Sequence, residues 1–427
     1  MTKKVVIINK SDSTGGAAVV SRRLMEALRD IGLDARMLVC EKLTDSPFIE
    51  LAASPQKIKR KFLEERLKIF LANGFNLQTL FKIDTGEVGL PLWKHSMVKD
   101  ADAVLINWVN QGMLSLHGVK KILEMGKPVI WTMHDMWCMT GICHHAGTCR
   151  HYENECGECP LLGKRKGPYD LSGRIWRRKK ALLSNAEVMT KMAFVPVSNW
   201  LKEKALQSSL LKDMRLEVIP NAFPVPTEMG VGKTETGRIR ILFGAARLDD
   251  PIKGIDTLRE TSKVIRDRYP EIAKKMEIAM FGSIKDERCL EGFGVPVVRL
   301  GILRGEEAVK KAYRESDILV SASSYETLPG TLVEAQAYGC IPVSFNQGGQ
   351  RDIVSHLNTG YIAEYTEDIK TRAKNLAEGL IWAITQSEDT NKLTELKLRM
   401  HSNVEANFSY EAIAKKYINL IKQLEKS

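Results

Sequence analysis

The sequence lacks any apolar run that approaches the ~20 residues a helix needs to span a bilayer. Its first residues, MTKKVVIINK, carry only four apolar side chains after two lysines, too few for the core of a signal peptide and typical of a first β-strand. Internal repeats and low-complexity segments are also absent. With 44% apolar and 27% charged residues, the composition is ordinary for a soluble globular protein, and we expect a cytoplasmic one.

Cysteine is scarce, with eight in 427 residues. In a reducing cytoplasm these side chains should be free thiols, which excludes a disulfide framework as the basis of the fold. The length favours two or three domains, each with its own core.

Acidic residues are too few to balance the basic ones, 52 against 63, so the net charge is +11. A basic balance favours partners that carry phosphate, which include nucleic acid, anionic lipid and nucleotide donors. The densest basic runs, 57–68 and 173–180, have neither the heptads of a basic zipper nor the aromatic signature of a common RNA-binding sheet. No nucleic-acid partner is therefore expected. Each run is interpreted as either a solvated helix face or a surface that docks on an anionic membrane.

Short apolar runs alternate with amphipathic segments along the first half of the chain. This β-α-β rhythm is typical of a parallel sheet with helices on both faces. Helices are predicted at 18–32 and 114–126, among other places. Buried strands are predicted at 5–9, 35–40, 103–107, 128–133 and 194–198.

The same rhythm restarts after residues 221–238, a segment with two prolines, several glycines and no apolar period, which is typical of a linker. One helix of this second part is predicted at 255–269. Its strands are predicted at 239–246, 277–282, 295–301, 317–323 and 340–345. We therefore predict an α/β protein of two doubly wound domains, each of roughly 200 residues.

The segment SSYETLPGTLVEAQAYGCIPVSFNQGGQRDIV (323–354) holds the strongest cluster of candidate site residues. Glu326 follows a strand and Gly330–Cys340 is predicted as the next helix, so the loop 327–330 lies at a strand's carboxyl end. Open α/β sheets bind ligands there, and the N–H groups and dipole of the helix favour a diphosphate. Glu326 and Glu334 can then hold neutral hydroxyls on either side of the phosphates. Two glutamates at this spacing also suit ordinary surface positions.

This segment resembles the motif of glycosyltransferase family 4, the retaining enzymes of the GT-B fold, and the resemblance covers nearly the whole chain. It implies two Rossmann-like domains that face a cleft, with a C-terminal helix that crosses back to the first domain. The domains would be 1–220, joined by 409–427, on the acceptor side, and 221–408 for the nucleotide sugar. VIPNA (218–222) and FSYEAIAKKY (408–417) resemble the family's interdomain crossing and last helix.

The resemblance also assigns roles within the motif. It implies that Glu326 contacts the donor sugar and that Glu334 contacts the nucleotide ribose. The N–H groups of Leu328, Gly330 and Thr331 would bind the donor's diphosphate. Pro329, between Leu328 and Gly330, stands where many members have glycine, so one backbone N–H donor is missing here.

Two cations, Arg247 and Lys253, follow the first strand of the second domain within GAARLDDPIKGID (244–256). At a strand end they can neutralise a diphosphate, both on binding and as the leaving group gains charge. Similar enzymes carry an arginine and a lysine here, followed by a glycine such as Gly254. Five residues separate the pair in this chain, one more than is usual. The alternative is a pair of exposed cations in a basic protein.

The turn STGGAA (13–18) after the first strand lacks the G-x-G-x-x-G spacing of a dinucleotide site. Glu41 does stand where a ribose-binding acid would, but alone it is weak support for a nicotinamide enzyme. Glycosyltransferases of the family have a similar Gly-Gly turn near the donor phosphates and the acceptor, which makes Gly16 a candidate. A tight turn that needs glycine for its backbone is compatible with that role.

A histidine, His134, ends the predicted strand in WTMHDMW (131–137). The family has a histidine here, close to the donor sugar and the acceptor. A lone histidine is more often structural, but the carboxyl end of a parallel strand favours a functional role.

Four cysteines, Cys143, Cys149, Cys156 and Cys159, fall within residues 138–160. The last two have metal-ligand spacing, whereas the first two have five residues between them, unlike a common zinc finger. A structural zinc site, reduced packing thiols and a redox pair all stay open. Three histidines are available as replacement ligands: His144, His145 and His151.

Together these expectations describe a hexosyltransferase that moves a sugar from a nucleotide diphosphate sugar to a hydroxyl acceptor with retention, in bacterial surface polysaccharide or glycolipid assembly. No cofactor beyond the donor is expected for the chemistry, because side-chain cations can stabilise the leaving group. Two alternatives are a nucleotide-sugar epimerase of the same fold and, from the charge of +11, a basic nucleic-acid-binding or membrane-binding protein.

The segment KIKRKFLEERLKIFLANGF (57–75) predicts an amphipathic helix with basic residues beside one apolar face, formed by Leu63, Leu67, Phe70 and Leu71. Such a helix can lie in the headgroup layer of a membrane, which would bring a lipid-linked acceptor into reach at the inner membrane face. The alternative is that the apolar face packs on the first domain and the lysines face water.

Overall fold

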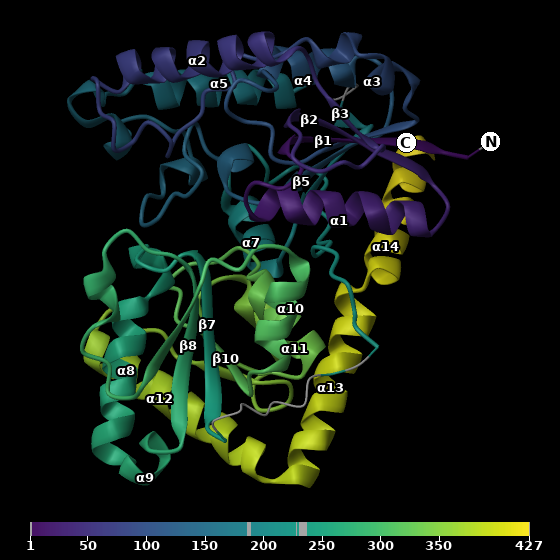
Figure 1. Ribbon diagram of the computed structural model, residues 1–427. Coiled ribbons are helices and arrows are strands. Elements are labelled where there is room, and N and C mark those ends of the chain that lie inside the picture. The colour runs from purple at the N-terminus through teal and green to yellow at the C-terminus, as the bar shows by residue number, and fades with distance from the viewer. Residues whose placement is uncertain (1, 186–188, 228, 230–236, 427) are drawn as a thin grey trace. The chain divides into compact units, whose positions relative to one another are not determined.

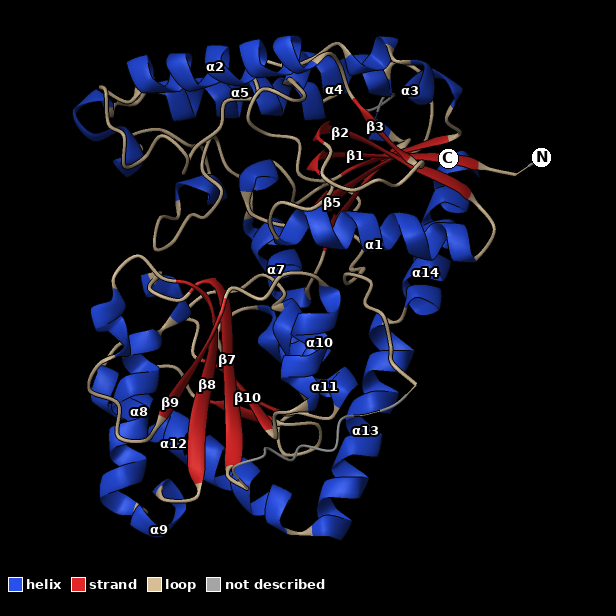
Figure 2. Cartoon of the chain, in the orientation of Figure 1, coloured by secondary structure: helices blue, strands red, loops and turns tan. Residues whose placement is uncertain are grey.

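The computed structural model describes residues 2–185, 189–227, 229 and 237–426. The chain divides into two compact units, a first unit of Met1–Ala222 with Tyr410–Ser427 and a second unit of Phe223–Ser409. Each unit holds one six-stranded sheet. The elements are labelled in Figure 1 and coloured by type in Figure 2. Of the linker expected at 221–238, residues 228 and 230–236 lie outside the described ones.

The sheet of the first unit is parallel throughout, in the order β3-β2-β1-β4-β5-β6. This is the strand order of a doubly wound nucleotide-binding fold, in which the order reverses between β1 and β4. Its strands are β1 (Lys4–Ser11), β2 (Asp34–Glu41), β3 (Ile49–Leu51), β4 (Ala103–Ile106), β5 (Val129–Met133) and β6 (Met192–Pro196).

The helices of the first unit are α1 (Gly16–Asp30), α2 (Pro55–Ala72), α3 (Ser96–Asp100), α4 (Leu116–Leu123), α5 (Leu171–Leu183), α7 (Asn199–Gln207) and α14 (Tyr410–Lys426). The last of these, drawn in yellow, packs against α1 and β5 (Figure 1). Its apolar face is buried in the core of the first unit, and Tyr417 Oη lies 2.9 Å from Thr132 Oγ1 of β5. The expected return of the C-terminal helix to the first sheet is confirmed.

The second unit repeats the same topology. Its parallel order β12-β11-β10-β7-β8-β9 again places the first strand of the unit next to the fourth. Its strands are β7 (Ile239–Arg247), β8 (Met276–Ser283), β9 (Val297–Gly301), β10 (Ile318–Ser321), β11 (Ile341–Phe345) and β12 (Tyr361–Ala363). Its helices are α8 (Ile255–Arg268), α9 (Pro270–Ala273), α10 (Glu306–Arg314), α11 (Gly330–Tyr338), α12 (Ile369–Glu388) and α13 (Thr390–Phe408).

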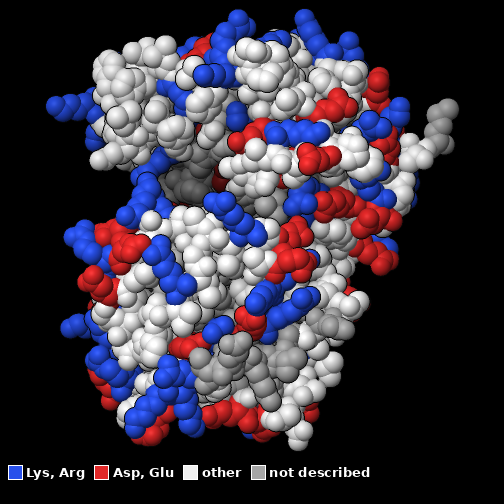
Figure 3. All heavy atoms as spheres, in the orientation of Figure 1, with Lys and Arg blue, Asp and Glu red and all other residues white. Residues whose placement is uncertain are grey.

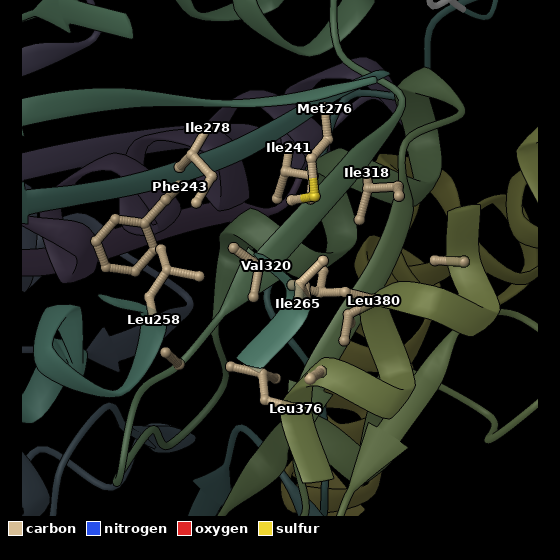
Figure 4. Close-up of a cluster of buried hydrophobic side chains, with 14 of the residues drawn as sticks. Ile241, Phe243, Leu258, Ile265, Met276, Ile278, Ile318, Val320, Leu376 and Leu380 are labelled. Atoms are coloured by element: carbon tan, nitrogen blue, oxygen red, sulfur yellow. The ribbon is translucent and has the colours of Figure 1, made fainter. Parts of the chain in front are cut away.

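The core of the second unit forms where the β-strands meet α8 and α12. Apolar side chains of β7, β8 and β10 point into it, among them Ile241, Ile278 and Val320, and Leu258 and Leu380 close it from the two helices (Figure 4). Strands buried on both faces explain why the sequence shows continuous apolar runs rather than alternation. No helix of the described residues is both long and apolar enough to cross a membrane.

Candidate functional site

The motif loop of the second unit lies between β10 and α11. The helix begins at Gly330 behind an N-cap, Pro329, whose side chain makes no capping hydrogen bond, so this residue gives the first-turn N–H groups no side-chain cap. Gly349 N donates to Glu326 O at 3.0 Å. Gly348 has φ 108°, and a Cβ there would lie 2.1 Å from the same oxygen. The glycine pair therefore holds the backbone of the loop in place.

The second cation of the loop after β7 reaches the motif. Lys253 Nζ donates to Glu326 Oε1 at 2.5 Å, across 73 positions of sequence. The backbone explains how: Gly254 has φ 74°, and a Cβ on it would lie 2.1 Å from Ala322 O. Ser324 N also donates to Ile252 O at 2.9 Å. The additional residue between the two cations therefore does not carry Lys253 away from the motif.

Arg247, the first cation, is placed differently. Its Nε lies 3.5 Å from Asp249 Oδ1 and its Nη2 lies 3.6 Å from Asp250 Oδ2, with 38% of the side chain exposed. It is thus held by carboxylates of its own loop, whereas Lys253 is held by the motif. Its weak, partly exposed ion pairs leave it able to exchange these carboxylates for another anion.

Glu334 lies on α11, half-buried, and Tyr313 of α10 donates its hydroxyl to Glu334 Oε2 at 3.0 Å. Tyr313 itself is fully buried and stacks on Tyr338, with ring centroids 5.8 Å apart. A buried donor of this kind fixes the rotamer of the carboxylate. Tyr313 could not be predicted from the sequence, because its contact with Glu334 depends on the packing of two helices.

In the first unit, a cavity of about 710 Å³ opens at the carboxyl ends of the strands. Its lining includes Gly15 and Gly16, which follow β1. Only Gly15 has a positive φ, 89°, so the turn needs glycine there for its backbone. Gly16 has an ordinary φ, and a Cβ on it would meet nothing within 4 Å. Gly16 therefore leaves space in the cavity wall.

His134 follows β5, and its Nε2 lies 3.1 Å from Asn107 Oδ1, just after β4. Burial lowers the pKa of His134 to about 4. The imidazole is therefore neutral at pH 7 and can serve as a hydrogen-bond partner rather than as a cation.

Next to His134, a buried ionic network fixes the strand ends. His144 lies between two carboxylates, with Nδ1 2.7 Å from Asp135 Oδ2 and Nε2 2.7 Å from Asp84 Oδ2. Burial opposes its charge, but the two carboxylates outweigh burial and raise the pKa of His144 to about 10. Asp135 also accepts from Trp108 Nε1 at 2.9 Å, and Arg66 of α2 pairs with Asp84. This network links α2 to the cavity wall and was not predicted.

The cysteine-rich segment gives no support for zinc. All four candidate ligands, Cys143, Cys149, Cys156 and Cys159, are free thiols, and the described residues contain no group of three or more possible ligands placed to hold a metal. Burial raises the pKa of Cys156 to about 11 and that of Cys159 to about 12, which disfavours the thiolates that zinc binds. Cys156 Sγ instead accepts from Gly141 N at 3.2 Å, as a packing thiol would.

The basic run 173–180 is not simply a solvated face. It forms most of α5, and Lys179 within it is buried. Its Nζ donates to Trp137 O at 2.5 Å and Thr140 O at 3.0 Å and lies 3.5 Å from the centroid of the Trp137 ring. The run therefore holds the loop that follows β5.

Comparison with known protein families gives a match within the second unit. Residues 300–398, which include both motif glutamates, match the family model of Glycosyl transferases group 1. The chain is a glycosyltransferase. No curated protein matches this chain.

Solved structures match the enzyme over its whole length, at low sequence identity. A glycosyltransferase from Rickettsia africae ESF-5 is 14% identical, with all of both chains covered and a TM-score of 0.63. Sucrose-phosphate synthase from Thermosynechococcus elongatus is 17% identical, with 99% of each chain covered and a TM-score of 0.59. Anabaena HepE in complex with UDP and glucose is 13% identical over 98% of this chain and 99% of that one, with a TM-score of 0.55. The fold is GT-B, as expected.

Proposed function

We propose that this enzyme is a retaining hexosyltransferase of family 4. It moves a sugar from a nucleotide diphosphate sugar to a hydroxyl acceptor in the assembly of a bacterial surface polysaccharide or glycolipid. The observation that carries the proposal is the pair of Lys253 and Glu326, 2.5 Å apart, with Glu326 in the loop that leads into α11. Lys253 follows β7, and Glu326 and the N-terminus of α11 follow the neighbouring strand β10. A cation, a carboxylate and helix N–H groups at these two strand ends suit a sugar joined to a diphosphate.

In this proposal the donor binds by exchange of partners. Its diphosphate takes Lys253 away from Glu326, and the freed carboxylate accepts hydrogen bonds from the sugar hydroxyls. The N–H groups of Leu328, Gly330 and Thr331 meet the same phosphates. Because the leaving diphosphate gains charge as the glycosidic bond breaks, these contacts strengthen in the transition state and speed the reaction.

Two further residues complete the donor site. Arg247 turns from the aspartates of its own loop to the diphosphate. The carboxylate of Glu334, which Tyr313 already orients, accepts hydrogen bonds from the ribose hydroxyls. Retention follows if the acceptor attacks on the face that the diphosphate leaves, and a phosphate oxygen then takes the acceptor's proton. No side chain is assigned as general base.

The acceptor binds to the first unit, near Gly16 and His134. The neutral His134 hydrogen-bonds sugar hydroxyls without competing for the diphosphate, since burial lowers its pKa to about 4. Its bond to Asn107 fixes the ring for that task.

The enzyme works at the inner membrane face, and the support for this part of the proposal is α2. Leu63, Leu67 and Leu71 are 53%, 58% and 49% exposed, so this side of the helix does not pack on the first unit. Figure 3 shows uncharged surface over the end of α2, at the upper left, with Lys and Arg side chains along the same edge. Exposed leucines flanked by cations match an anionic lipid surface.

A panel of nucleotide sugars scored by thermal shift tests the enzymatic proposal. A donor at ~100 times its Kd adds ~2.7 kcal/mol to the free energy of unfolding, which a melting curve resolves. We expect one nucleotide diphosphate sugar to raise the Tm and the free sugar not to. If no member of the panel raised the Tm, the donor assignment would be wrong.

Co-sedimentation with phosphatidylglycerol vesicles tests the membrane contact. We expect binding at low salt that weakens at high salt, because exposed charges are screened. Leu67→Glu should release the protein, whereas Leu398→Glu, at a leucine of the second unit that is equally exposed (56%), should not. If the wild-type protein stays in the supernatant at low salt, the proposed contact of α2 with the membrane is wrong.

A further inference from the structure

The cavity of the first unit, about 710 Å³ in volume, is partly built by α2. Its remaining lining follows the carboxyl ends of β1, β2 and β4. Pro55, Ile58, Lys59 and Phe62 of α2 form one wall of the cavity. The same helix therefore serves both the cavity and the exposed leucine surface.

The lining of this cavity carries three kinds of chemistry. Trp108 and Phe62 offer aromatic faces, on which the apolar face of a sugar ring can stack. Glu41 is exposed at the end of β2 and can accept hydrogen bonds from hydroxyls. Two lysines, Lys10 and Lys59, bring positive charge. Positive charge in the wall of a cavity favours a ligand that carries negative charge over a purely neutral saccharide.

The two lysines differ in their partners. Lys10 Nζ donates to Gln111 O at 2.9 Å and lies 5.5 Å from the centroid of the Phe62 ring. Lys59 is exposed, and no described residue pairs with it. An ammonium group that lines a cavity without a protein partner is suited to an anion.

Lys59 also begins a row of side chains along α2. Residues four apart lie on one face of a helix, so Lys59, Leu63, Leu67 and Leu71 follow one another. The first lines the cavity and the other three are exposed. At 1.5 Å per residue the row spans about 18 Å. Along α2, the row therefore leads from a cation in the cavity wall to an exposed hydrocarbon surface.

We infer that the acceptor is a saccharide joined through a phosphate or diphosphate to a lipid. The saccharide occupies the cavity between Trp108 and Glu41, Lys59 binds the phosphate, and the lipid runs along Leu63, Leu67 and Leu71 at the membrane surface. The inference rests on the proposed function and names its acceptor class. It also gives one reason for the Arg66–Asp84–His144 network, which holds this helix against the cavity wall.

Isothermal titration of the full chain with geranyl diphosphate tests this assignment, with geraniol and inorganic pyrophosphate as comparison probes. We expect geranyl diphosphate to bind at least tenfold more tightly than either. Lys59→Ala should weaken it at least tenfold and Lys59→Arg should restore most of the affinity. Lys57→Ala, at an exposed lysine of the same helix outside the cavity, is the matched control and should not change the Kd.

The outcomes separate the possible errors. Lys253→Ala leaves geranyl diphosphate binding intact if the probe occupies the first unit, and a tenfold loss there would show that it binds the donor site. Equal affinity for pyrophosphate and geranyl diphosphate would overturn the lipid part of the inference. An unchanged Kd in Lys59→Ala would overturn the role of Lys59 in binding the phosphate. If geranyl diphosphate binds as expected while no nucleotide sugar raises the Tm, the proposed function fails instead.

Discussion

At the scale of single residues, Lys253 and Arg247 start from different positions. Lys253 is bound to Glu326, and Arg247 is bound to the carboxylates of its own loop. Since each is proposed to meet the leaving diphosphate, Lys253→Ala and Arg247→Ala should each lower kcat, by about 10²–10³-fold for a contact made in the transition state. Steady-state kinetics measure this, with Lys374→Ala on α12 as an exposed control. Wild-type turnover in Lys253→Ala would show that the ion pair is unrelated to the donor site.

Glu334 should matter for the nucleotide more than for the sugar. Loss of a charged hydrogen bond costs about 1.5–3 kcal/mol, so Glu334→Ala should raise the Kd of the free nucleotide diphosphate by roughly ten- to a hundredfold. Tyr313→Phe should give a smaller rise, because it removes only the hydroxyl that orients Oε2. Titration calorimetry with the nucleotide alone is the measurement. The ribose role is wrong if neither variant changes the Kd.

His144 should make stability depend on pH. Although burial opposes the charge, Asp135 and Asp84 raise the pKa of His144 from 6.5 to about 10. The folded protein thus keeps a proton that the unfolded chain loses, so this stabilisation is complete below pH 6.5 and disappears as the pH rises to about 10.

We expect the free energy of unfolding to fall more steeply across this window in the wild-type protein than in His144→Gln. Denaturant titrations at a series of pH values provide both profiles. Their difference isolates His144 from Lys179, whose pKa burial lowers to about 8. Parallel profiles would mean that His144 is not charged in the folded protein.

At the scale of elements, α14 belongs to the core of the first unit although it is last in the chain. Leu420 is fully buried there, close in sequence to Tyr417, which reaches β5. Leu420→Ala removes buried methyl groups and leaves a cavity, which should cost about 2–5 kcal/mol. Urea unfolding measures the loss. A change below 1 kcal/mol would indicate that α14 contributes little to the unit's stability.

The elements also show what the sequence can and cannot predict. The long apolar runs and the helix of the Glu326 motif were predicted, because buried parallel strands and helix periods leave a local pattern. The strands β3 and β12 were missed, since each has three residues at a sheet edge. Strand β6 begins two residues earlier than the predicted run at 194.

The contacts of the candidate site follow a similar division. The motif residues and Lys253 could be named from sequence, but the ion pair between Lys253 and Glu326 and the partner of Glu334 could not. Asp84 and His144 are 60 residues apart, and Tyr313 and Glu334 are 21 apart. Such pairs depend on how elements pack, and single-sequence patterns carry no information about that packing. For zinc, the spacing of the cysteines suggested ligands, but the described residues contain no group of three or more possible ligands placed to hold a metal.

At the scale of the whole molecule, two units with the same doubly wound topology divide the proposed work. The second unit carries the matched family segment and the proposed donor site, and the first carries the cavity and α2. A shared strand order places the functional residues of both units at the carboxyl ends of their strands. The proposed function therefore requires that sugar transfer depends on the motif loop.

Transfer from the stabilising nucleotide sugar, compared in wild-type, Glu326→Gln and Glu367→Gln proteins of equal Tm, tests this claim most directly. Glu367 is an exposed glutamate of the second unit and is the control. We expect Glu326→Gln to abolish transfer, because an amide cannot replace the carboxylate that is proposed to bind the sugar hydroxyls, and we expect Glu367→Gln to keep the wild-type rate. Wild-type turnover by Glu326→Gln would contradict the proposed function.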